Sequence, residues 1–369
     1  MAPVKSITAV RFHGANNITV DEVACPEINH PHDVLFEPHW SGICGTDLHE
    51  YECGPVLIPH PGHPHPLTKA EPPVTIGHEM SGVVVEVGSA VTKVKPGDKI
   101  CIEAVISCGK CYACSRGQTN CCTDRGFYGL SGIGGGFAEL SVAPESIVHK
   151  LPNDIDLKIG ALVEPLAVAY HAVKLGDVKE GDTALILGAG PIGIACILAL
   201  QIVGFSKIYV SEPALIRRNQ AERFGATVID PLNEDTLERV REITNNAGVD
   251  VTFDCAGNQL VAELALNALR PGGKAVIIAI SAKPFIIDYY SLLIDQEKSL
   301  VGSICYNYQD FEDVIDALRT KKIDPSPMIT GTINARHIVE HGFEQLVHHK
   351  EEHIKIIGTL KDELLYHLV

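Results

Sequence analysis

The sequence lacks any apolar run of about 18 residues, the minimum for a membrane-spanning helix. Its start, Met-Ala-Pro-Val-Lys-Ser, also lacks a long apolar stretch, so we expect no signal peptide and a cytoplasmic location. Positive charge is scarce as well: the formal net charge is −16, which argues against nucleic acid or an anionic membrane surface as a partner. Without an export signal, the twelve cysteines indicate metal ligation or free thiols rather than disulfides.

The chain is long enough for more than one hydrophobic core. Its 369 residues exceed the size at which single cores stop growing, so two domains are expected. Residues 4–40 alternate apolar and polar side chains between turn residues, and residues 77–88 and 91–100 continue this pattern of short strands. The first 160 residues are therefore expected to form an antiparallel, β-rich domain.

A glycine turn follows a buried-looking strand near the middle of the chain. Residues 183–187 are almost wholly apolar, as in a parallel strand buried on both faces, and residues 194–203 predict a helix. Between them, Gly188, Gly190 and Gly193 have the G-x-G-x-x-G spacing. These glycines permit a tight turn, close approach of phosphates and close helix–strand packing, while the helix start offers free N–H groups. The arrangement predicts a dinucleotide site.

An acidic residue ends the next apolar run, residues 207–210. Glu212 lies about 20 residues after the glycines, where a carboxylate can bind the ribose diol and repel a 2′-phosphate, which favours NAD over NADP. Arg217 or Arg218 could instead reach a phosphate, but Glu212 is closer to the strand end. The candidate cofactor residues are Gly188, Gly190, Pro191, Ile192, Gly193, Glu212 and Arg217.

Four cysteines are closely spaced in the first domain. Cys108, Cys111 and Cys114 recur every third residue, and a fourth thiol follows at Cys122, with Cys121 as a competitor. Four thiolates can close around one zinc ion, which would be structural because no coordination position stays open. The alternative is a set of free thiols.

A second, dispersed set contains Cys44, His78, Glu79 and Glu164. Singly, each is more easily a buried small residue or a loop residue, but together they offer thiolate, imidazole and carboxylate to a catalytic zinc. The adjacent pair His78–Glu79 needs a bent backbone, which Gly77 makes plausible. Zinc with Cys44, His78 and Glu79 is near neutral, whereas Glu164 would make it anionic, so we expect Glu164 to be a switching or water-mediated ligand.

These motifs resemble the zinc-dependent medium-chain dehydrogenase/reductase family over essentially the whole chain. The polyol branch is most similar because Glu79 follows His78 and Glu164 stands where ordinary alcohol dehydrogenases have a second cysteine. Within it, residues 47–51, 54–59 and 64–68 look most like (R,R)-2,3-butanediol dehydrogenases. The similarity also favours Cys122 over Cys121. The motifs are Gly42-Ile-Cys-Gly-Thr-Asp-Leu-His49, Gly77-His-Glu79, the four cysteines, Leu162-Val-Glu-Pro165 and Gly188-Ala-Gly-Pro-Ile-Gly193.

The resemblance implies an α/β fold with a GroES-like β-rich catalytic domain (residues 1–160), a Rossmann domain with a doubly wound, six-stranded parallel sheet (161–305) and a return to the catalytic domain (306–369). It also implies a homodimer or homotetramer that pairs Rossmann sheets edge to edge. From the residues, strands are expected at 249–253, 275–280, 299–304, 328–333 and 353–357, and helices at 214–223, 260–269 and 308–318.

The implied reaction is hydride transfer between a secondary alcohol and NAD, most readily 2,3-butanediol, acetoin or diacetyl, with one catalytic and one structural zinc. The alcohol proton could leave through Thr46 and His49, or to a zinc-activated water assisted by Glu164. A sorbitol- or xylitol-type polyol dehydrogenase is the alternative enzyme, and a non-catalytic zinc-containing binding protein is the alternative of another class. Residues 59–66, with four prolines and three histidines, either wall the substrate cleft or form a solvent-exposed loop.

Overall fold

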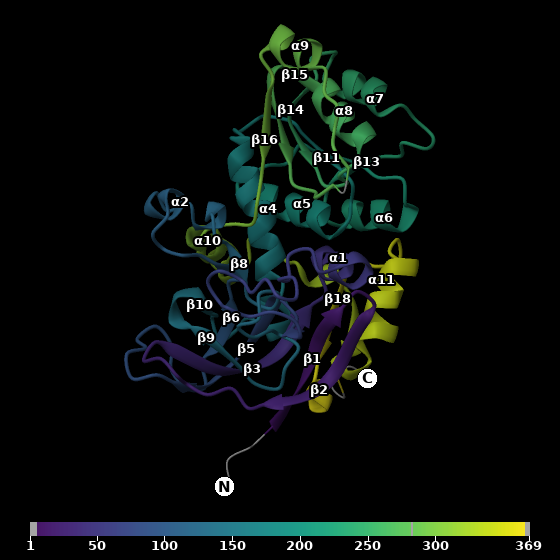
Figure 1. Ribbon diagram of the computed structural model, residues 1–369. Helices are drawn as coiled ribbons and strands as arrows, with labels where there is room; N and C mark the ends of the chain where they lie inside the picture. Colours follow the sequence, from purple (N-terminus) through teal and green to yellow (C-terminus); the bar gives the residue numbers. More distant parts are fainter. Residues whose placement is uncertain (1–5, 282, 366–369) are drawn as a thin grey trace. The chain divides into compact units, whose positions relative to one another are not determined.

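The computed structural model describes residues 6–281 and 283–365, and its contacts divide the chain into two compact units (Figure 1). The first unit comprises Met1–Glu164, Asn307–Arg319 and Ile329–Val369, and the second comprises Pro165–Tyr306 and Thr320–Met328. The boundaries expected from the sequence placed the first division after residue 160 and assigned residues 320–328 to the catalytic domain.

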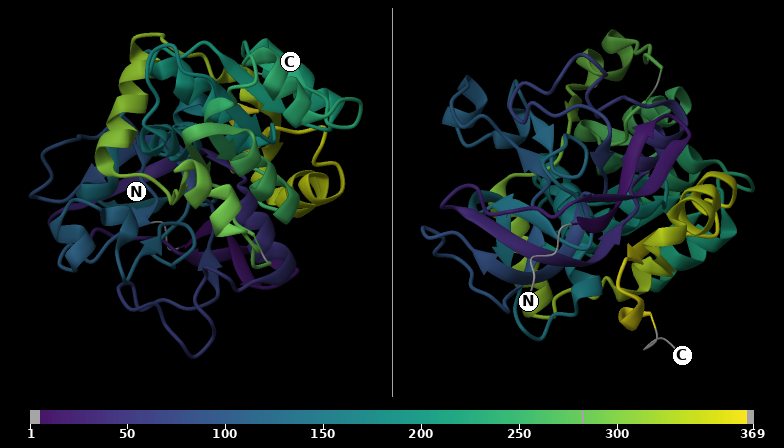
Figure 2. Two further views of the ribbon diagram at one scale, coloured as in Figure 1. Left: turned by 90° about the horizontal axis from the view of Figure 1, so that it is seen from above. Right: turned by 60° about the horizontal axis from the view of Figure 1, so that its bottom comes forward.

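The first unit is built from β-sheets, as the alternating pattern predicted. A hairpin of β1 and β2, purple in Figures 1 and 2, also pairs with β4, and the larger sheet has the order β10-β6-β5-β3-β18-β17 with β9 on β3. The strands are β1 (Ser6–Gly14), β2 (Asn17–Ala24), β3 (Asp33–Gly42), β4 (Val74–Thr75), β5 (Glu79–Val87), β6 (Lys99–Ile102), β7 (Val105–Ile106), β8 (Gly126–Phe127), β9 (Ser141–Pro144), β10 (Val148–Lys150), β17 (Ile329–Asn334) and β18 (Lys355–Thr359). The helices are α1 (Gly45–Cys53), α2 (Tyr112–Ser115), α3 (Leu157–Gly160), α10 (Tyr308–Arg319) and α11 (Glu344–His348).

The strand expected over residues 91–100 was wrong for most of its length. β6 begins only at Lys99, because the residues before it form a turn in which Gly97 has φ +87° and the Asp98 carboxylate accepts the Lys95 N–H at 3.0 Å. The turn residues Pro96 and Gly97 therefore outweighed the apolar alternation.

The second unit contains the six-stranded parallel sheet that was expected, in the order β13-β12-β11-β14-β15-β16. Its order reverses at β11, whose Leu187 lies in register with Ser211 on one side and Asp254 on the other. Its strands are β11 (Ala184–Leu187), β12 (Ile208–Ser211), β13 (Thr227–Ile229), β14 (Val249–Asp254), β15 (Leu269–Ile277) and β16 (Ser299–Gly302). The helices that alternate with them are α4 (Val163–Gly176), α5 (Pro191–Ile202), α6 (Leu215–Arg223), α7 (Thr236–Ile243), α8 (Gln259–Asn267) and α9 (Tyr289–Leu292).

Burial explains why β11 and α5 read as continuous apolar runs. All four residues of β11 are buried, and α5 is buried from Gly193 to Leu200, so neither element has a polar face.

The helix expected over residues 260–269 ends earlier, at Asn267, and forms α8. Leu269 already belongs to β15, where it pairs with Val249. Among the helices of the described residues, none combines the length and hydropathy needed to cross a lipid bilayer.

Candidate active site and metal centres

Ligand atoms of Cys44, His78 and Glu79 lie within 4.8 Å of one another in the first unit. Cys44 precedes α1 as its N-cap, and His78 and Glu79 stand at the start of β5. The backbone bends at Gly77, which has φ +101°, a backbone conformation that residues other than glycine rarely adopt. Opposite Glu79 in the sheet is Gly42, where a Cβ would lie only 2.0 Å from a Glu79 carboxylate oxygen. The glycine therefore leaves room for the carboxylate.

Asp47 supports both neighbouring ligands, a role that the sequence analysis missed. One carboxylate oxygen accepts the Cys44 N–H at 2.9 Å, and the other lies 3.3 Å from His78 Nδ1. Burial would lower the pKa of His78, but Asp47 and Cys44 raise it well above its ordinary value. Surroundings that stabilise a cation on this imidazole, together with a soft thiolate, suit a bound zinc ion.

Lys355 is a second residue that the sequence analysis missed. Its ammonium lies 2.7 and 2.8 Å from the two carboxylate oxygens of Glu79 and donates to the Ile43 carbonyl at 3.1 Å. Only 2% of Lys355 is exposed, because it belongs to β18, which lies between β3 and β17 in the sheet. The signal in the sequence was a lysine inside the apolar run 354–357, where an unpaired charge would be costly.

Glu164, Thr46 and His49 were also expected near the catalytic zinc, but Glu164 does not join the group of close ligand atoms formed by Cys44, His78 and Glu79. Glu164 is buried in the first turn of α4, and its charge helps to raise the pKa of Lys355, which burial alone would lower. The Thr46 hydroxyl lies 3.7 Å from Cys44 Sγ. His49 is exposed and follows Thr46 by three residues on α1, so both side chains lie on one side of the helix.

The closely spaced cysteines also converge. Cys108, Cys111, Cys114 and Cys122 offer sulfur atoms within 4.8 Å of one another, whereas Cys121 is exposed. Backbone N–H groups face the sulfurs: Cys108 N lies 3.3 Å from Cys122 Sγ, and hydrogen bonds from Cys114 and Thr123 lower the pKa of Cys111 to about 6. Amide donors that stabilise thiolates fit a closed all-sulfur metal site.

The glycine turn in the second unit has the geometry that its spacing predicted. Gly188 has φ +98°, and a Cβ at Gly193 would lie 1.9 Å from the Gly188 carbonyl oxygen, so both positions need glycine. A Cβ at Gly190 would meet only Arg217 Nη1, at 3.8 Å. Pro191 and Ile192 form the first turn of α5, so the open side of Gly190 lies at a helix N-terminus next to a guanidinium, as an anion site requires.

Glu212 is buried at the end of β12 and is tied to the glycine turn. Its carboxylate accepts the Ala189 N–H at 2.7 Å and the Ala214 N–H at 2.8 Å. Arg218, which could have favoured a phosphate, instead bonds the carbonyl of Glu212 at 2.9 Å and the carboxylate of Asp230 at 2.7 Å. Arg217 is therefore the arginine that faces the turn.

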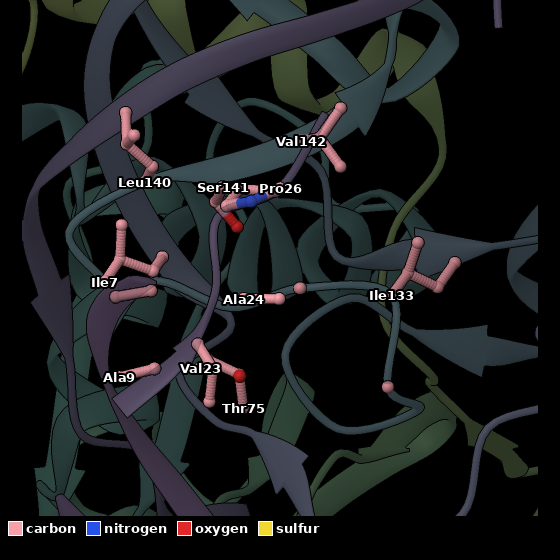
Figure 3. A pocket seen from close by; sticks show the side chains of 13 residues that line it. Ile7, Ala9, Val23, Ala24, Pro26, Thr75, Ile133, Leu140, Ser141 and Val142 are labelled. Carbon is pink, nitrogen blue, oxygen red and sulfur yellow. The ribbon is translucent and has the colours of Figure 1, made fainter. Parts of the chain in front are cut away.

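The first unit also contains a pocket with mostly apolar lining, shown in Figure 3, which shares no residue with the candidate metal sites. It includes none of the candidate ligands and no titratable side chain, so it offers no acid–base or metal chemistry. It is lined by Ile7, Ala9, Val23, Ala24, Pro26, Thr75, Gly132, Ile133, Gly134, Ala138, Leu140, Ser141 and Val142.

Comparison with known proteins agrees with this architecture. Residues 30–153 match the alcohol dehydrogenase GroES-like domain, and residues 191–320 match the zinc-binding dehydrogenase family. The (R,R)-butanediol dehydrogenase of Saccharomyces cerevisiae is 41% identical over 360 residues, 92% of this chain and 94% of the yeast protein. A probable D-xylulose reductase A of Aspergillus fumigatus is 31% identical over 91% of this chain and 92% of its own.

The structural comparison extends over the same length. The crystal structure of 2R,3R-butanediol dehydrogenase from Bacillus subtilis matches with a TM-score of 0.89 and 35% identity, covering 96% of this chain and 100% of the Bacillus chain. Because two relatives are more than 30% identical over nearly their whole length, the chain belongs to the zinc-dependent alcohol dehydrogenases of the medium-chain dehydrogenase/reductase family, which confirms the resemblance inferred from the sequence.

Proposed function

We propose that this protein is a cytoplasmic, NAD-dependent dehydrogenase that interconverts a secondary alcohol and a ketone, with 2,3-butanediol, acetoin and diacetyl as its substrates. The observation that carries the proposal is the convergence of Cys44, His78 and Glu79 within 4.8 Å in a chain 41% identical to a butanediol dehydrogenase. A sorbitol- or xylitol-type specificity is the second candidate, since a D-xylulose reductase is 31% identical over 91% of the chain.

We infer that Cys44, His78, Glu79 and Glu164 hold the catalytic zinc. Lys355 changes the charge balance expected from the sequence, because its ammonium neutralises one carboxylate. The negative charges of the two carboxylates and the Cys44 thiolate then equal the positive charges of one zinc ion and the Lys355 ammonium. Glu164 can therefore approach the metal without making the site anionic. Of the two roles expected for Glu164, this count favours the switching ligand over the water-mediated one.

The chain's own residues have to hold and move a proton. Bound zinc would favour ionisation of the alcohol, and bound NAD would accept the hydride from the alcohol carbon. In the first route, the Thr46 hydroxyl beside Cys44 would accept the alcohol proton while giving up its own, and exposed His49 would pass the released proton to solvent. The buried carboxylate of Glu164 is the alternative acceptor. Replacement of His49 by Gln distinguishes the two routes, because only the first loses its imidazole-dependent limb in the pH profile of kcat.

We propose NAD rather than NADP as the cofactor. The Glu212 carboxylate is held at the end of β12 by two backbone N–H groups. Each of its oxygens retains a further lone pair that can accept a ribose hydroxyl, and its negative charge repels a 2′-phosphate. Arg218 is engaged with Asp230, which removes one competing phosphate ligand. Higher kcat/KM with NADP than with NAD would contradict this assignment, and Glu212→Ser should relax the preference.

A substrate panel tests the reaction itself. Steady-state kcat/KM should be highest for one 2,3-butanediol stereoisomer or acetoin, and sorbitol or xylitol exceeding every butanediol isomer would favour the second candidate. Turnover that Cys44→Ser leaves intact would contradict the proposed metal site. Absence of turnover with every alcohol, despite bound zinc and NAD, would favour a non-catalytic binding protein.

We propose a second, structural zinc in the four-cysteine cluster, giving two ions per chain. Elemental analysis of the purified protein should find two zinc equivalents, and a chelator should remove the catalytic ion first because Glu164, as a switching ligand, leaves a coordination position open when it moves away. One equivalent that resists chelation supports the split between the two sites.

We also propose a homodimer formed through the second unit. Its sheet ends at β16, where Leu300 is 37% exposed, and nearby segments expose further large apolar side chains. These are Ile286, Tyr289, Tyr290 and Ile294. Light scattering should give twice the mass of one chain, and Leu300→Lys should shift the measured mass toward that of the monomer. A dimer mass that the substitution leaves unchanged would exclude this sheet edge as the interface. A wild-type mass of four chains would show that a second surface assembles the dimers.

A further inference from the structure

The residues between Cys44 and His78 include a long irregular segment with two side-chain anchors. After α1 ends at Cys53, residues 54–73 form no helix or strand before β4 begins at Val74. Irregular segments of this length inside a folded domain are generally functional or disordered. This one is held in place, and the two buried side chains that hold it are Glu50 and His65.

Glu50 fixes the beginning of the segment to α1. Its carboxylate, 2% exposed, accepts the N–H groups of Val56 at 2.9 Å and Ile58 at 3.1 Å, as well as that of Leu57. The Gly54 N–H adds a bond to the Glu50 carbonyl at 2.9 Å. A buried carboxylate that accepts three backbone N–H groups leaves this turn little freedom.

His65 fixes the far end, and each ring nitrogen has a separate task. Nδ1 accepts the N–H groups of Leu67 and Thr68, both at 3.3 Å, so it carries no proton. Nε2 therefore carries the proton and donates to the Arg125 carbonyl at 3.3 Å. The ring packs on Gly126, where a Cβ would lie 2.7 Å from its Cε1. One nitrogen shapes the segment, and the other ties it to residue 125.

That carbonyl belongs to the chain leaving the four-cysteine cluster. Arg125 follows Cys122, whose carbonyl accepts the Arg125 N–H at 3.2 Å, and the Arg125 guanidinium bonds the Asn120 carbonyl. A second link runs parallel to the first: the Thr68 hydroxyl donates to the Ser131 carbonyl at 2.6 Å. The segment is therefore joined at two points to residues 125–131, which begin at the cluster.

The other end of the segment reaches the neighbourhood of the catalytic ligands. Ile58 and Leu57 belong to the same apolar cluster as Ile43 and Leu48, which are the chain neighbours of Cys44 and His49. Phe127, from the stretch that His65 contacts, packs in this cluster as well. A displacement of the segment from residues 125–131 would thus change the packing beside the metal ligands.

We propose that His65 is a positioning residue for the alcohol substrate, acting by holding the segment 54–73 against the chain that leaves the four-cysteine cluster. The proposal rests on the dehydrogenase function proposed above. The hydrogen bonds of His65 go to Leu67, Thr68 and Arg125 rather than to a metal ligand. Its loss should therefore weaken binding of the alcohol and leave hydride transfer and NAD binding intact. The same link makes alcohol binding depend on an intact four-cysteine cluster.

The test uses two substitutions that each imitate one ring nitrogen. His65→Asn places an acceptor near the Nδ1 position but cannot reach Arg125, whereas His65→Gln places an N–H donor near the Nε2 position. His65→Asn should raise the KM for the alcohol about tenfold, with kcat, the KM for NAD and zinc content unchanged, and His65→Gln should restore most of the loss. His63→Asn, exposed in the same segment, is the matched control and should behave like the wild type.

Thr68→Val provides an independent variant, because it removes the parallel link without touching the imidazole, and it should also raise the KM for the alcohol. All measurements use whichever alcohol the wild type turns over fastest, so that a wrong substrate assignment affects only the proposed function. Wild-type KM in His65→Asn, failure of His65→Gln to exceed His65→Asn, or an equal fall in kcat and zinc content would overturn the proposal.

Discussion

Lys355 and Glu79 form a bidentate ion pair whose two N–O distances are 2.7 and 2.8 Å, with both side chains 1% exposed. The lysine comes from β18 and the glutamate from β5, so the return of the chain to the first unit supplies the positive charge beside the candidate metal site. The pair lets a carboxylate stay beside the candidate zinc without adding a net negative charge.

Replacement of Lys355 by Met should destabilise the first unit by about 3–5 kcal/mol, the usual cost of leaving a buried charge without its partner. The free energy of unfolding in urea measures this effect. Lys355→Met combined with Glu79→Gln should recover part of the loss, because the uncompensated charge is then removed. If the double variant is as unstable as the sum of the two single ones, the pair does not act as a unit.

Asp47→Asn should lower the affinity of the candidate catalytic site for zinc by about 10- to 100-fold, since a carboxylate beside a histidine ligand orients the imidazole and makes it more basic. The amide would keep the shape beside His78 but lose the charge. Competition with a chromogenic chelator measures the affinity. Glu52→Gln, on the exposed side of the same helix, should have wild-type affinity; an equal fall in both variants would contradict the assignment.

His149 on β10 is buried between Glu103, 3.3 Å from Nε2, and Glu312 of α10, which bonds Nδ1. Burial would lower the pKa of His149, but the two carboxylates raise it above 6.5. The charged imidazole therefore stabilises the fold fully below pH about 6.5, and this contribution is lost as the pH rises through the higher folded-state pKa. The hydrogen bond to His149 lowers the pKa of Glu312, so the pair needs a pH above about 4.5.

Glu312→Gln should consequently reduce the free energy of unfolding by about 1 kcal/mol at pH 6, a modest value because the Glu312 side chain is 40% exposed. The difference from the wild type should shrink as the pH rises through the folded-state pKa of His149, because the imidazole then loses its charge in both proteins. Urea titrations at several pH values measure it. A difference that does not change between pH 6 and pH 9 would assign the loss to packing rather than to charge.

Cys122→Ser should remove one zinc equivalent per chain and lower Tm, whereas Cys121→Ser should change neither, because only Cys122 lies with the other three sulfurs. Loss of a structural metal generally costs several kcal/mol of folding free energy. Elemental analysis and a thermal melt of both variants provide the comparison. Equal zinc loss in the two variants would show that Cys121 can replace its neighbour.

Much of the architecture could be predicted from local sequence. The apolar run 183–187 and the spacing of Gly188, Gly190 and Gly193 predicted a parallel strand, a turn and a helix, because buried strands and phosphate-binding turns each need particular residues in sequence order. The six-stranded parallel sheet and the family are confirmed by the structure and the relatives. The bend at Gly77 agrees with its φ of +101°.

Other features depended on residues far apart in the chain. No spacing rule connects Lys355 to Glu79, or His65 to the carbonyl of Arg125, because these contacts exist only once strands and loops from different parts of the sequence have packed. The strand expected over residues 91–100 failed for the opposite reason, since a local turn at Gly97 prevailed over alternation. The sequence by itself determined which chemical groups this protein has available and in what order. Tertiary packing decided which charges neutralise one another, because burial makes an unpaired charge costly and so selects partners by proximity in space.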